Sequence, residues 1–369
     1  MRVALVHDWL TGMRGGERVL EVLCELFPAA DLFTLVHVPG SVSATIERHG
    51  PRTSFIQRLP LASRLYRYYL PLFPRAVERF RFDGYDLVIS SSHCAVKSVV
   101  TRAPTRHLCY CHTPMRYAWD QFELYFGPER LGRFGSAAAR VVMRRLARWD
   151  AATADRPNRY VANSRYVASR IRRYYNREAA VVYPPVDTDF FHPDGRTPDR
   201  RLLIVSALVP YKRIDVAIEA ARLSGVPLCI VGEGPERERL EAAAGPDVEF
   251  LGRRSDAEIL ELYRSCAATV LPGEEDFGIA PVEGQACGRP VVALGRGGAL
   301  ETVVPGRTGV LVADDSPSAL AAGMTDVLAT AFDAEAIRSH ALRFGRPRFA
   351  AELKAAVDEL LEAPGDARW

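Results

Sequence analysis

Short apolar runs alternate with helix-length amphipathic segments along the whole chain, and this alternation constrains the fold more than any other feature. It is typical of βαβ units, in which helices connect parallel strands. The first series of expected strands comprises Arg2–Val6, Leu32–Val36, Asp86–Ser90, His107–Tyr110 and Tyr160–Ala162. The second comprises Arg201–Ser206, Leu228–Val231, Val248–Leu251, Ala268–Leu271, Val291–Leu294 and Val310–Val312. The sequence therefore predicts an α/β protein with two parallel sheets.

A proline pair, Pro184-Pro185, separates the two series and suits an interdomain connector. We expect a first domain over residues 1–185, a second over 186–348, and a terminal helix within 349–369, where apolar residues recur at helical spacing. The 369 residues suffice for two domains of ordinary size. A cleft between the domains is the predicted active site.

The composition excludes several classes of protein. A net charge of +3 does not indicate a nucleic-acid partner. Seven cysteines without a CxxC pair form no recognisable disulfide framework or zinc ligand set. The first apolar run is too short for a signal peptide, and no segment approaches the roughly 20 apolar residues that cross a bilayer. We expect a cytoplasmic protein.

The segment Pro272–Glu283 carries two carboxylates, Glu275 and Glu283, around a glycine turn that opens a helix. The turn follows an expected strand, and ligands of open α/β sheets bind at the carboxyl ends of strands. The backbone amides that would face an anion are those of Gly278, Ile279 and Ala280. For an isolated pair of this kind, charge at a helix start and a solvated helix residue would be the favoured interpretation. With its neighbours, the segment indicates a site for a polyol that carries phosphate, without metal ligation.

This segment resembles the E-x7-E signature of retaining glycosyltransferases of family four, which have the GT-B fold. That fold has two Rossmann-like domains with parallel sheets facing a central cleft, and its last helix returns to the first domain. The resemblance implies that Glu275 holds hydroxyls of the donor hexose and that Glu283 holds the nucleotide ribose. It also places Phe277, Gly278, Ile279 and Ala280 at the donor.

Lys212 is the expected cation for the donor diphosphate. The chain has only three lysines, and this one follows an expected strand in a loop similar to the family's glycine-arginine-leucine…lysine loop. Ser206 and Ala207 stand where that pattern has glycine and arginine, so Arg213 is expected to assist, with Arg253 and Arg296 as alternatives. A solvated helix start is the competing interpretation of Lys212-Arg213.

Three further loops complete the predicted donor site. Gly232 and Arg253 lie in segments similar to the family's wall against the nucleobase. In the first domain, Gly15 and Gly16 let the backbone approach phosphate or sugar. They form no GxGxxG fingerprint, which disfavours an oxidoreductase.

His112 follows an expected strand, and Pro114 forces the intervening Thr113 into an extended conformation. A lone histidine is usually structural, but the family pattern places one here beside the transferred sugar. The resemblance implies that His112 positions the sugar and stabilises charge. His93 and Lys97 could contact the acceptor or cap a helix.

Two segments, Arg64–Phe82 and Glu129–Trp149, mix arginines with aromatic and aliphatic residues. Such surfaces can dock on an anionic membrane. Ordinary helix packing with a solvated basic face explains the pattern equally well.

Three motifs look most like the WbaZ-like bacterial mannosyltransferases: Gly15–Arg18, Cys111–Tyr117 and Pro210–Arg213. The implied function is retaining transfer of mannose from GDP-mannose to a lipid-linked glycan in polysaccharide assembly. No cofactor, metal or nucleic acid is expected, and the enzyme would work at the inner face of the cell membrane. The alternatives are a UDP-glucose-type transferase on the same fold and a catalytically impaired sugar-nucleotide-binding protein, because Ala207 replaces the usual arginine.

Overall fold

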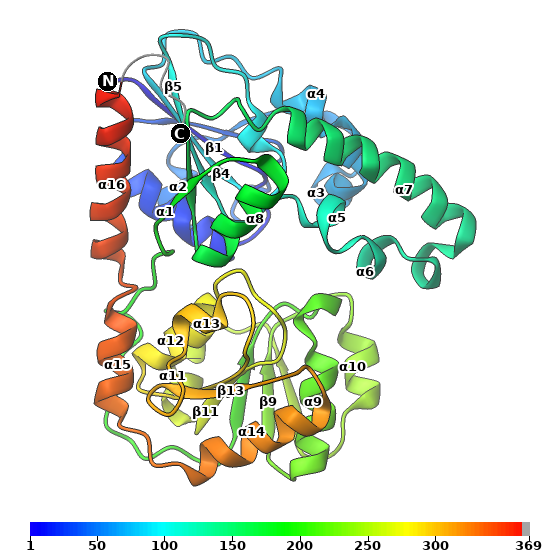
Figure 1. Ribbon diagram of the computed structural model, residues 1–369, viewed down its shortest axis with the longest axis vertical. Coiled ribbons are helices and arrows are strands. Elements are labelled where there is room, and N and C mark those ends of the chain that lie inside the picture. The colour runs from blue at the N-terminus through cyan, green and yellow to red at the C-terminus, as the bar shows by residue number, and fades with distance from the viewer. Residues whose placement is uncertain (364–369) are drawn as a thin grey trace. The chain divides into compact units, whose positions relative to one another are not determined.

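Two parallel sheets organise the computed structural model, which describes residues 1–363 (Figure 1). Contacts divide the chain into two units. Unit 1 contains Met1–Pro185 together with the C-terminal segment from Phe349 onward, and unit 2 contains Val186–Arg348.

The sheet of unit 1 has seven strands, all parallel, in the order β3-β2-β1-β4-β5-β6-β7. Their bounds are β1 Val3–His7, β2 Asp31–Thr34, β3 Arg52–Thr53, β4 Leu87–Ser92, β5 Arg106–Cys111, β6 Arg159–Ala162 and β7 Ala179–Val181. The five predicted strands are confirmed, but β4 runs two residues beyond its predicted end. The sequence did not reveal β3 and β7, because these edge strands are only two and three residues long.

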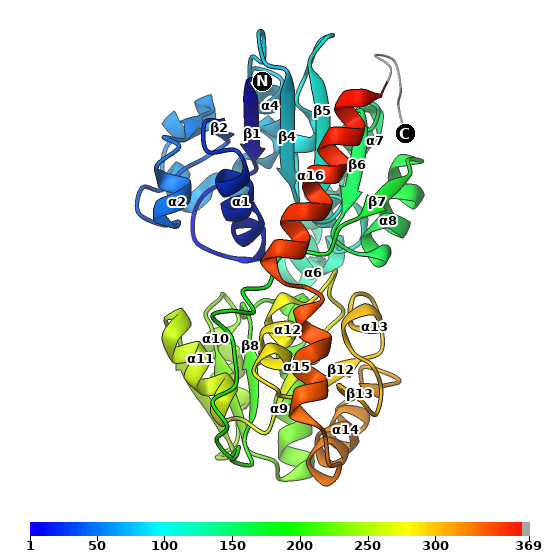
Figure 2. The ribbon, with the colours of Figure 1, turned by 90° about the vertical axis from the view of Figure 1, so that its left-hand side faces the viewer.

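Helices cover both faces of this sheet. They are α1 Gly15–Leu26, α2 Ala44–Glu47, α3 Ala62–Leu65, α4 Phe73–Val77, α5 Arg116–Trp119, α6 Phe122–Phe126, α7 Pro128–Ala152, α8 Arg165–Tyr175 and α16 Arg346–Glu362. On one face, α1 and the unit 1 part of α16 pack on alternate strand residues such as Leu5 and Ile89 (Figure 2). On the other face, α4 and α7 pack with Val6 and Val88. Because both faces are covered, the central strands β1 and β4 are buried throughout, whereas the edge strands β3 and β7 are not.

Unit 2 has a six-stranded parallel sheet in the order β10-β9-β8-β11-β12-β13. Its strands are β8 Leu202–Val205, β9 Leu228–Val231, β10 Val248–Gly252, β11 Ala268–Leu271, β12 Val291–Leu294 and β13 Gly309–Val312. Its helices are α9 Ile214–Ser224, α10 Arg237–Ala243, α11 Asp256–Ser265, α12 Ile279–Ala286, α13 Ala299–Thr302, α14 Pro317–Ala329 and α15 Ala334–Leu342. One face of the sheet shares a core with α9 and α14, and the other packs on α13. All six predicted strands of the second series are confirmed.

Each sheet has one point at which the strand order reverses. In unit 1 this point lies between β1 and β4, and in unit 2 it lies between β8 and β11. Loops that leave adjacent strands at such a point diverge, which opens a crevice at the carboxyl ends of the strands where ligands bind. The fold therefore predicts ligand-binding residues after β1 and β4 and after β8 and β11.

Candidate functional site

Lys212 and Glu275 meet at the switch point of unit 2. Lys212 ends the short 3-10 helix η4, Pro210–Lys212, which follows β8, and Glu275 lies in the loop after β11. The Lys212 ammonium donates a hydrogen bond to Glu275 Oε1, and both side chains are largely buried. The Lys212 Nζ also lies 5.1 Å from the centre of the Tyr211 ring. Two predicted site residues, 63 positions apart, thus form one charged pair.

Glycines bring the backbones of these loops together. A Cβ atom at Gly273 would lie 2.5 Å from the Tyr211 carbonyl oxygen and 2.9 Å from that of Lys212. Gly298 approaches the same loop from the other side, because its amide donates to the Glu275 carbonyl oxygen at 2.8 Å. Only residues without a side chain permit such close approach. The position of Glu275 beside Lys212 therefore depends on glycine at these points.

Helix α12 begins where the sequence predicts it. Gly278 is its N-cap residue with φ 89°, a left-handed conformation that favours glycine, and no side chain caps the helix. Ile279 and Ala280 form the first turn and are half-buried, whereas Phe277 is buried and its ring packs edge-to-face on Phe344. The predicted amides thus lie at a helix N-terminus beside the Glu275 loop.

Glu283 lies on α12, where the Tyr263 hydroxyl donates a hydrogen bond to its Oε2 at 3.1 Å and to the Ala280 carbonyl oxygen at 2.9 Å. Burial, followed by the negative charge of Glu283, raises the pKa of Tyr263 well above its ordinary value. Tyr263 therefore remains a donor and holds the Glu283 carboxylate in place. The sequence did not single out Tyr263.

The other predicted cations of unit 2 differ in their partners. Arg213 adopts a left-handed conformation with φ 52° and pairs with Asp315, and its Nε lies 3.6 Å from Asp215 Oδ1. Arg253 is exposed and has no ion-pair partner among residues 1–363. Arg213 is therefore paired with two carboxylates, whereas Arg253 lies at the surface.

Gly232 joins the loops after β8 and β9. It has φ 137°, and a Cβ atom there would overlap the Ser206 carbonyl oxygen. Ala207, next along the chain, is exposed. Gly232 thus has a packing role that the sequence did not predict, in addition to its expected place near a ligand.

In unit 1, His112 directly follows β5 and its ring is held by β4. The Ser91 Oγ lies 2.8 Å from His112 Nε2 and 3.1 Å from His7 Nδ1. His7 and Ser91 are paired positions of the parallel strands β1 and β4, and both are fully buried. The Tyr110 ring packs edge-to-face on His112 at 5.2 Å. The sequence predicted His112 but missed His7 and Ser91 as its partners.

Asp8 fixes the loop that carries His93. Its carboxylate accepts hydrogen bonds from the amides of His93, Cys94, Ala95 and Val96 at 2.7–3.1 Å. Complete burial raises the pKa of Asp8, although these amides act in the opposite direction. Burial, with the charge of His7, lowers the pKa of His93 to about 3, so His93 is neutral near pH 7.

The predicted glycine pair forms the first turn of α1. A Cβ atom at Gly16 would lie 3.3 Å from His7 Cε1 and 3.8 Å from His112 Nε2, so this turn lies against both rings. Gly15 is the first residue of the helix. The structure thus brings Gly16 and His112 together in unit 1, while the predicted residues from Lys212 onward belong to unit 2.

Lys97 does not belong to this site. It is 1% exposed, and its Nζ lies 3.0 Å from Asp150 Oδ1 and donates to the Asp150 carbonyl oxygen at 2.7 Å. A buried lysine needs such an ion pair to remain charged. Lys97 therefore connects α7 to the segment that follows β4, and its expected contact with an acceptor is not supported.

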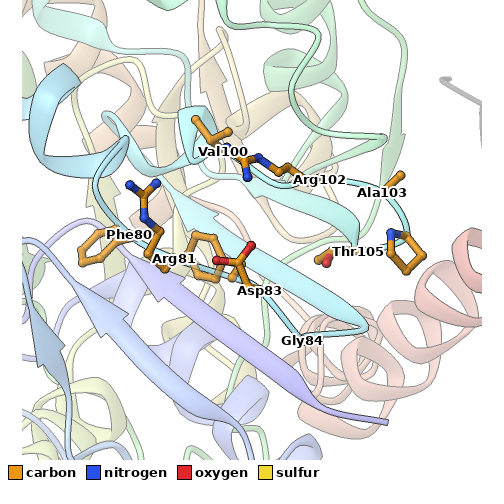
Figure 3. Close-up of a pocket in the computed structure, with 10 residues that line it drawn as sticks. Phe80, Arg81, Asp83, Gly84, Val100, Arg102, Ala103 and Thr105 are labelled. Atoms are coloured by element: carbon orange, nitrogen blue, oxygen red, sulfur yellow. The ribbon is translucent and has the colours of Figure 1, made fainter.

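A pocket of about 360 Å³ lies at the opposite end of the unit 1 strands (Figure 3). Its lining comes from the segments that precede β4 and β5 and includes Arg81, Asp83 and Arg102. It contains none of the predicted site residues. Within residues 1–363, no group of three or more His, Cys, Asp or Glu side chains is placed to hold a metal ion.

Comparison with solved structures defines the class of fold. Anabaena HepE in complex with UDP superposes with a TM-score of 0.70 at 19% identity, covering 97% of this chain and 100% of that one. Sucrose-phosphate synthase from Thermosynechococcus elongatus gives a TM-score of 0.70 at 19% identity, covering 99% and 100% of the two chains. Together with the two parallel-sheet units, these likenesses show the α/β GT-B fold.

Family models identify the protein more closely. The model "Glycosyltransferase Family 4" matches residues 13–190, and the model "Glycosyl transferases group 1" matches residues 186–343. The chain is therefore a two-domain member of the glycosyltransferases of family 4 and group 1.

Curated relatives agree with this assignment. The D-inositol 3-phosphate glycosyltransferase of Thermobispora bispora is 32% identical over 252 residues, which cover 56% of this chain and 57% of that protein. An uncharacterized glycosyltransferase of Methanocaldococcus jannaschii is 30% identical over 169 residues, covering 44% and 47%. The chain spans about half the length of the curated relatives it matches.

Proposed function

We propose that the protein transfers a hexose from a nucleotide-sugar donor to an acceptor hydroxyl, with retention of the anomeric configuration. The observation that carries this proposal is the Lys212–Glu275 pair at the switch point of unit 2, next to the N-terminus of α12. A cation, a carboxylate and free helix amides suit a ligand that combines diphosphate with sugar hydroxyls.

Each residue has a distinct part in the proposed reaction. Glu275 accepts hydrogen bonds from the hexose hydroxyls, and Lys212 stabilises the charge that develops on the leaving diphosphate. Glu283, held by Tyr263, accepts from the ribose hydroxyls. His112 contacts the transferred sugar. The departing phosphate helps to deprotonate the acceptor, so that no enzyme nucleophile is needed.

GDP-mannose is the donor we propose, on the three motifs that resemble the WbaZ-like mannosyltransferases. UDP-glucose is the second candidate, because a structure of the same fold, Anabaena HepE, was determined with UDP-glucose at a TM-score of 0.69. Calorimetric titration with both donors and with GDP and UDP separates the two. Saturable binding of GDP-mannose and GDP, without binding of UDP-glucose or UDP, is expected, and preference for UDP-glucose would replace our donor assignment.

Ala207 favours a second candidate function, that of a sugar-nucleotide-binding protein with impaired catalysis. Arg213, the expected substitute for the missing arginine, is paired with Asp315 in this conformation. Transfer of radiolabelled hexose into membrane lipid distinguishes an enzyme from a binder. We expect transfer by the wild type and a gain for Ala207→Arg. Donor binding without transfer in both proteins would establish the binder instead. Activity after exhaustive chelation tests the expectation that no metal or cofactor takes part.

The proposed acceptor is a lipid-linked glycan at the inner face of an anionic membrane, and the outer face of α7 is the proposed docking surface. Figure 1 shows α7 extending away from the sheet of unit 1. Phe134 is 93% exposed and Val141 is 52% exposed, and their spacing of seven places them on one side of the helix. None of the helices within residues 1–363 has both the length and the apolar character needed to span a bilayer.

The charge of this surface matches an anionic partner. Four exposed arginines of α7 have no ion-pair partner among the described residues: Arg133, Arg144, Arg145 and Arg148. From residue 130 to the buried Asp150, α7 carries no acidic residue. Exposed aromatic and aliphatic groups beside unpaired arginines are the combination that binds headgroups and the acyl boundary of a bilayer.

A further inference from the structure

A chain of buried polar groups connects α1 to His112. Glu17 Oε1 lies 3.8 Å from His7 Nε2, His7 Nδ1 lies 3.1 Å from Ser91 Oγ, and the same oxygen lies 2.8 Å from His112 Nε2. All but His112 are at most 3% exposed, and His112 is 9% exposed. Three of these four residues have no role in the site predicted from the sequence.

The chemistry of Ser91 gives this chain a direction. Its hydroxyl has one proton and contacts two histidine nitrogens, so it donates to one of them and accepts from the other. Glu17 is ionised near neutral pH: burial raises its pKa, but His7 together with His93 and Arg14 outweighs that effect, so the pKa is lowered. At 3.8 Å the Glu17 carboxylate is too far from His7 Nε2 for a hydrogen bond, but its negative charge favours the proton of His7 on this nitrogen. His7 Nδ1 then accepts from Ser91, and Ser91 accepts from His112.

Other charged and titratable groups surround the chain. Arg14 and Arg67 contribute positive charge near Glu17 and His93, and Asp8 holds the His93 loop. The His93 ring lies 5.5 Å from His7 and 6.2 Å from His112. Because the pKa of His93 is lowered to about 3, His93 adds no positive charge near pH 7. Near pH 7, Glu17 therefore faces His7 as its ion-pair partner.

We propose that Glu17, His7 and Ser91 act as a positioning relay that holds His112 in the tautomer with its proton on Nε2. Nδ1 is then the basic nitrogen of His112, able to accept a hydrogen bond from a hydroxyl of the transferred sugar. This use of the relay rests on the proposed transfer reaction. The relay itself is a property of unit 1 and can be measured without turnover.

The tautomer can be read directly from the full chain labelled with ¹⁵N-histidine. Long-range ¹H–¹⁵N spectra show which ring nitrogen carries the proton, and His112→Gln identifies the signals of His112. We expect the Nε2–H form in the wild type and a mixture of tautomers in Ser91→Ala and in Glu17→Gln. Ser91→Thr, which keeps the hydroxyl, should retain the wild-type form. In parallel, hexose transfer should fall about tenfold in Ser91→Ala, the equivalent of one lost hydrogen bond. The acid limb of its pH–rate profile should also shift.

Ser90→Ala is the matched control. Ser90 is the preceding residue of β4, equally buried, and its Oγ lies 2.8 Å from Nε2 of another histidine, His107. This variant should change the signals of His107 and leave His112 and transfer unaltered. Unchanged His112 tautomer in both Ser91→Ala and Glu17→Gln overturns the relay, as does an equal response to Ser90→Ala. Should Ser91→Ala not fold, Glu17→Gln alone decides. A tautomer that responds as expected in a protein without detectable transfer supports the relay and removes the proposed function.

Discussion

The two switch points differ in where their polar side chains lie: within buried strands in unit 1 and outside the strands in unit 2. In unit 1, His7 and Ser91 are strand residues with no exposed surface, and the cluster around His112 belongs to the hydrophobic interior of the sheet. In unit 2, Lys212 ends the short helix η4 and Glu275 lies in a loop, with side chains 19% and 10% exposed, and glycine contacts set their distance. Changes in unit 1 should therefore affect stability and protonation, whereas changes at the unit 2 pair should affect ligand chemistry alone.

The largest effect expected is that of Lys212→Ala on transfer. Loss of one group that stabilises charge in a transition state costs about 10²–10³ in kcat, or about 3–4 kcal/mol. Because Lys212 lies outside the hydrophobic core of unit 2, thermal unfolding should change little. Initial rates with saturating donor measure the effect. Lys354→Ala, which removes an exposed lysine of α16, is the control and should retain wild-type activity. Activity of Lys212→Ala close to that of the wild type would exclude the diphosphate role.

The next effect concerns the glycine that sets the loop distance. Gly273→Ala places a methyl group 2.5 Å from the Tyr211 carbonyl oxygen, and overpacking of this kind costs about 1–3 kcal/mol. The loops must separate, so donor affinity should fall together with the melting temperature. Gly245→Ala adds a methyl group to open space in the same unit and should change neither. Normal donor affinity in Gly273→Ala would show that the Lys212–Glu275 distance is not set by this contact.

We expect unit 1 to lose folding stability as the pH falls, because it contains a buried neutral histidine, His107. Burial, with the charge of Lys97, lowers the pKa of His107 to about 3, below the ordinary value of 6.5. Between these values the unfolded chain binds a proton that the folded chain does not, so stability falls as the pH decreases. His107 alone should cost about 2 kcal/mol between pH 7 and pH 5.

Tryptophan fluorescence can follow this loss in unit 1. Three of the four tryptophans, Trp9, Trp119 and Trp149, belong to unit 1, and the fourth lies outside the described residues. Denaturant midpoints at pH 7 and pH 5 should converge in His107→Gln relative to the wild type. His49→Gln, a partly exposed histidine of the same unit, should behave like the wild type. If His107→Gln lost as much stability between pH 7 and pH 5 as the wild type, another group would be responsible for the acid sensitivity.

The sequence revealed the strands and the chemistry of unit 2 better than the polar chain of unit 1. Apolar runs marked eleven strands because most of these strands are buried, whereas the two edge strands β3 and β7 are only two and three residues long. Lys212 and Glu275 were found because each follows a strand, although their direct contact depends on Gly273. His7 and Ser91 lie 84 residues apart, and only the register of β1 and β4 joins them. The available signal was the polar run Ser90-Ser91-Ser92 at the end of an otherwise apolar strand.

The smallest effect expected tests the surface of unit 1 away from either switch point. Each basic residue near an anionic membrane contributes about 1 kcal/mol, so Arg145→Ala should weaken binding to phosphatidylglycerol vesicles about fivefold in flotation assays. Zwitterionic vesicles should not bind the wild type. Arg172→Ala is the control, because Arg172 is an exposed arginine of α8 that is already paired with Glu178. Binding that ignores lipid charge, or that Arg172→Ala weakens as much as Arg145→Ala, would remove α7 as the docking surface. Unit 1 would then contribute only its buried relay, and the contrast between the two switch points would rest on their chemistry alone.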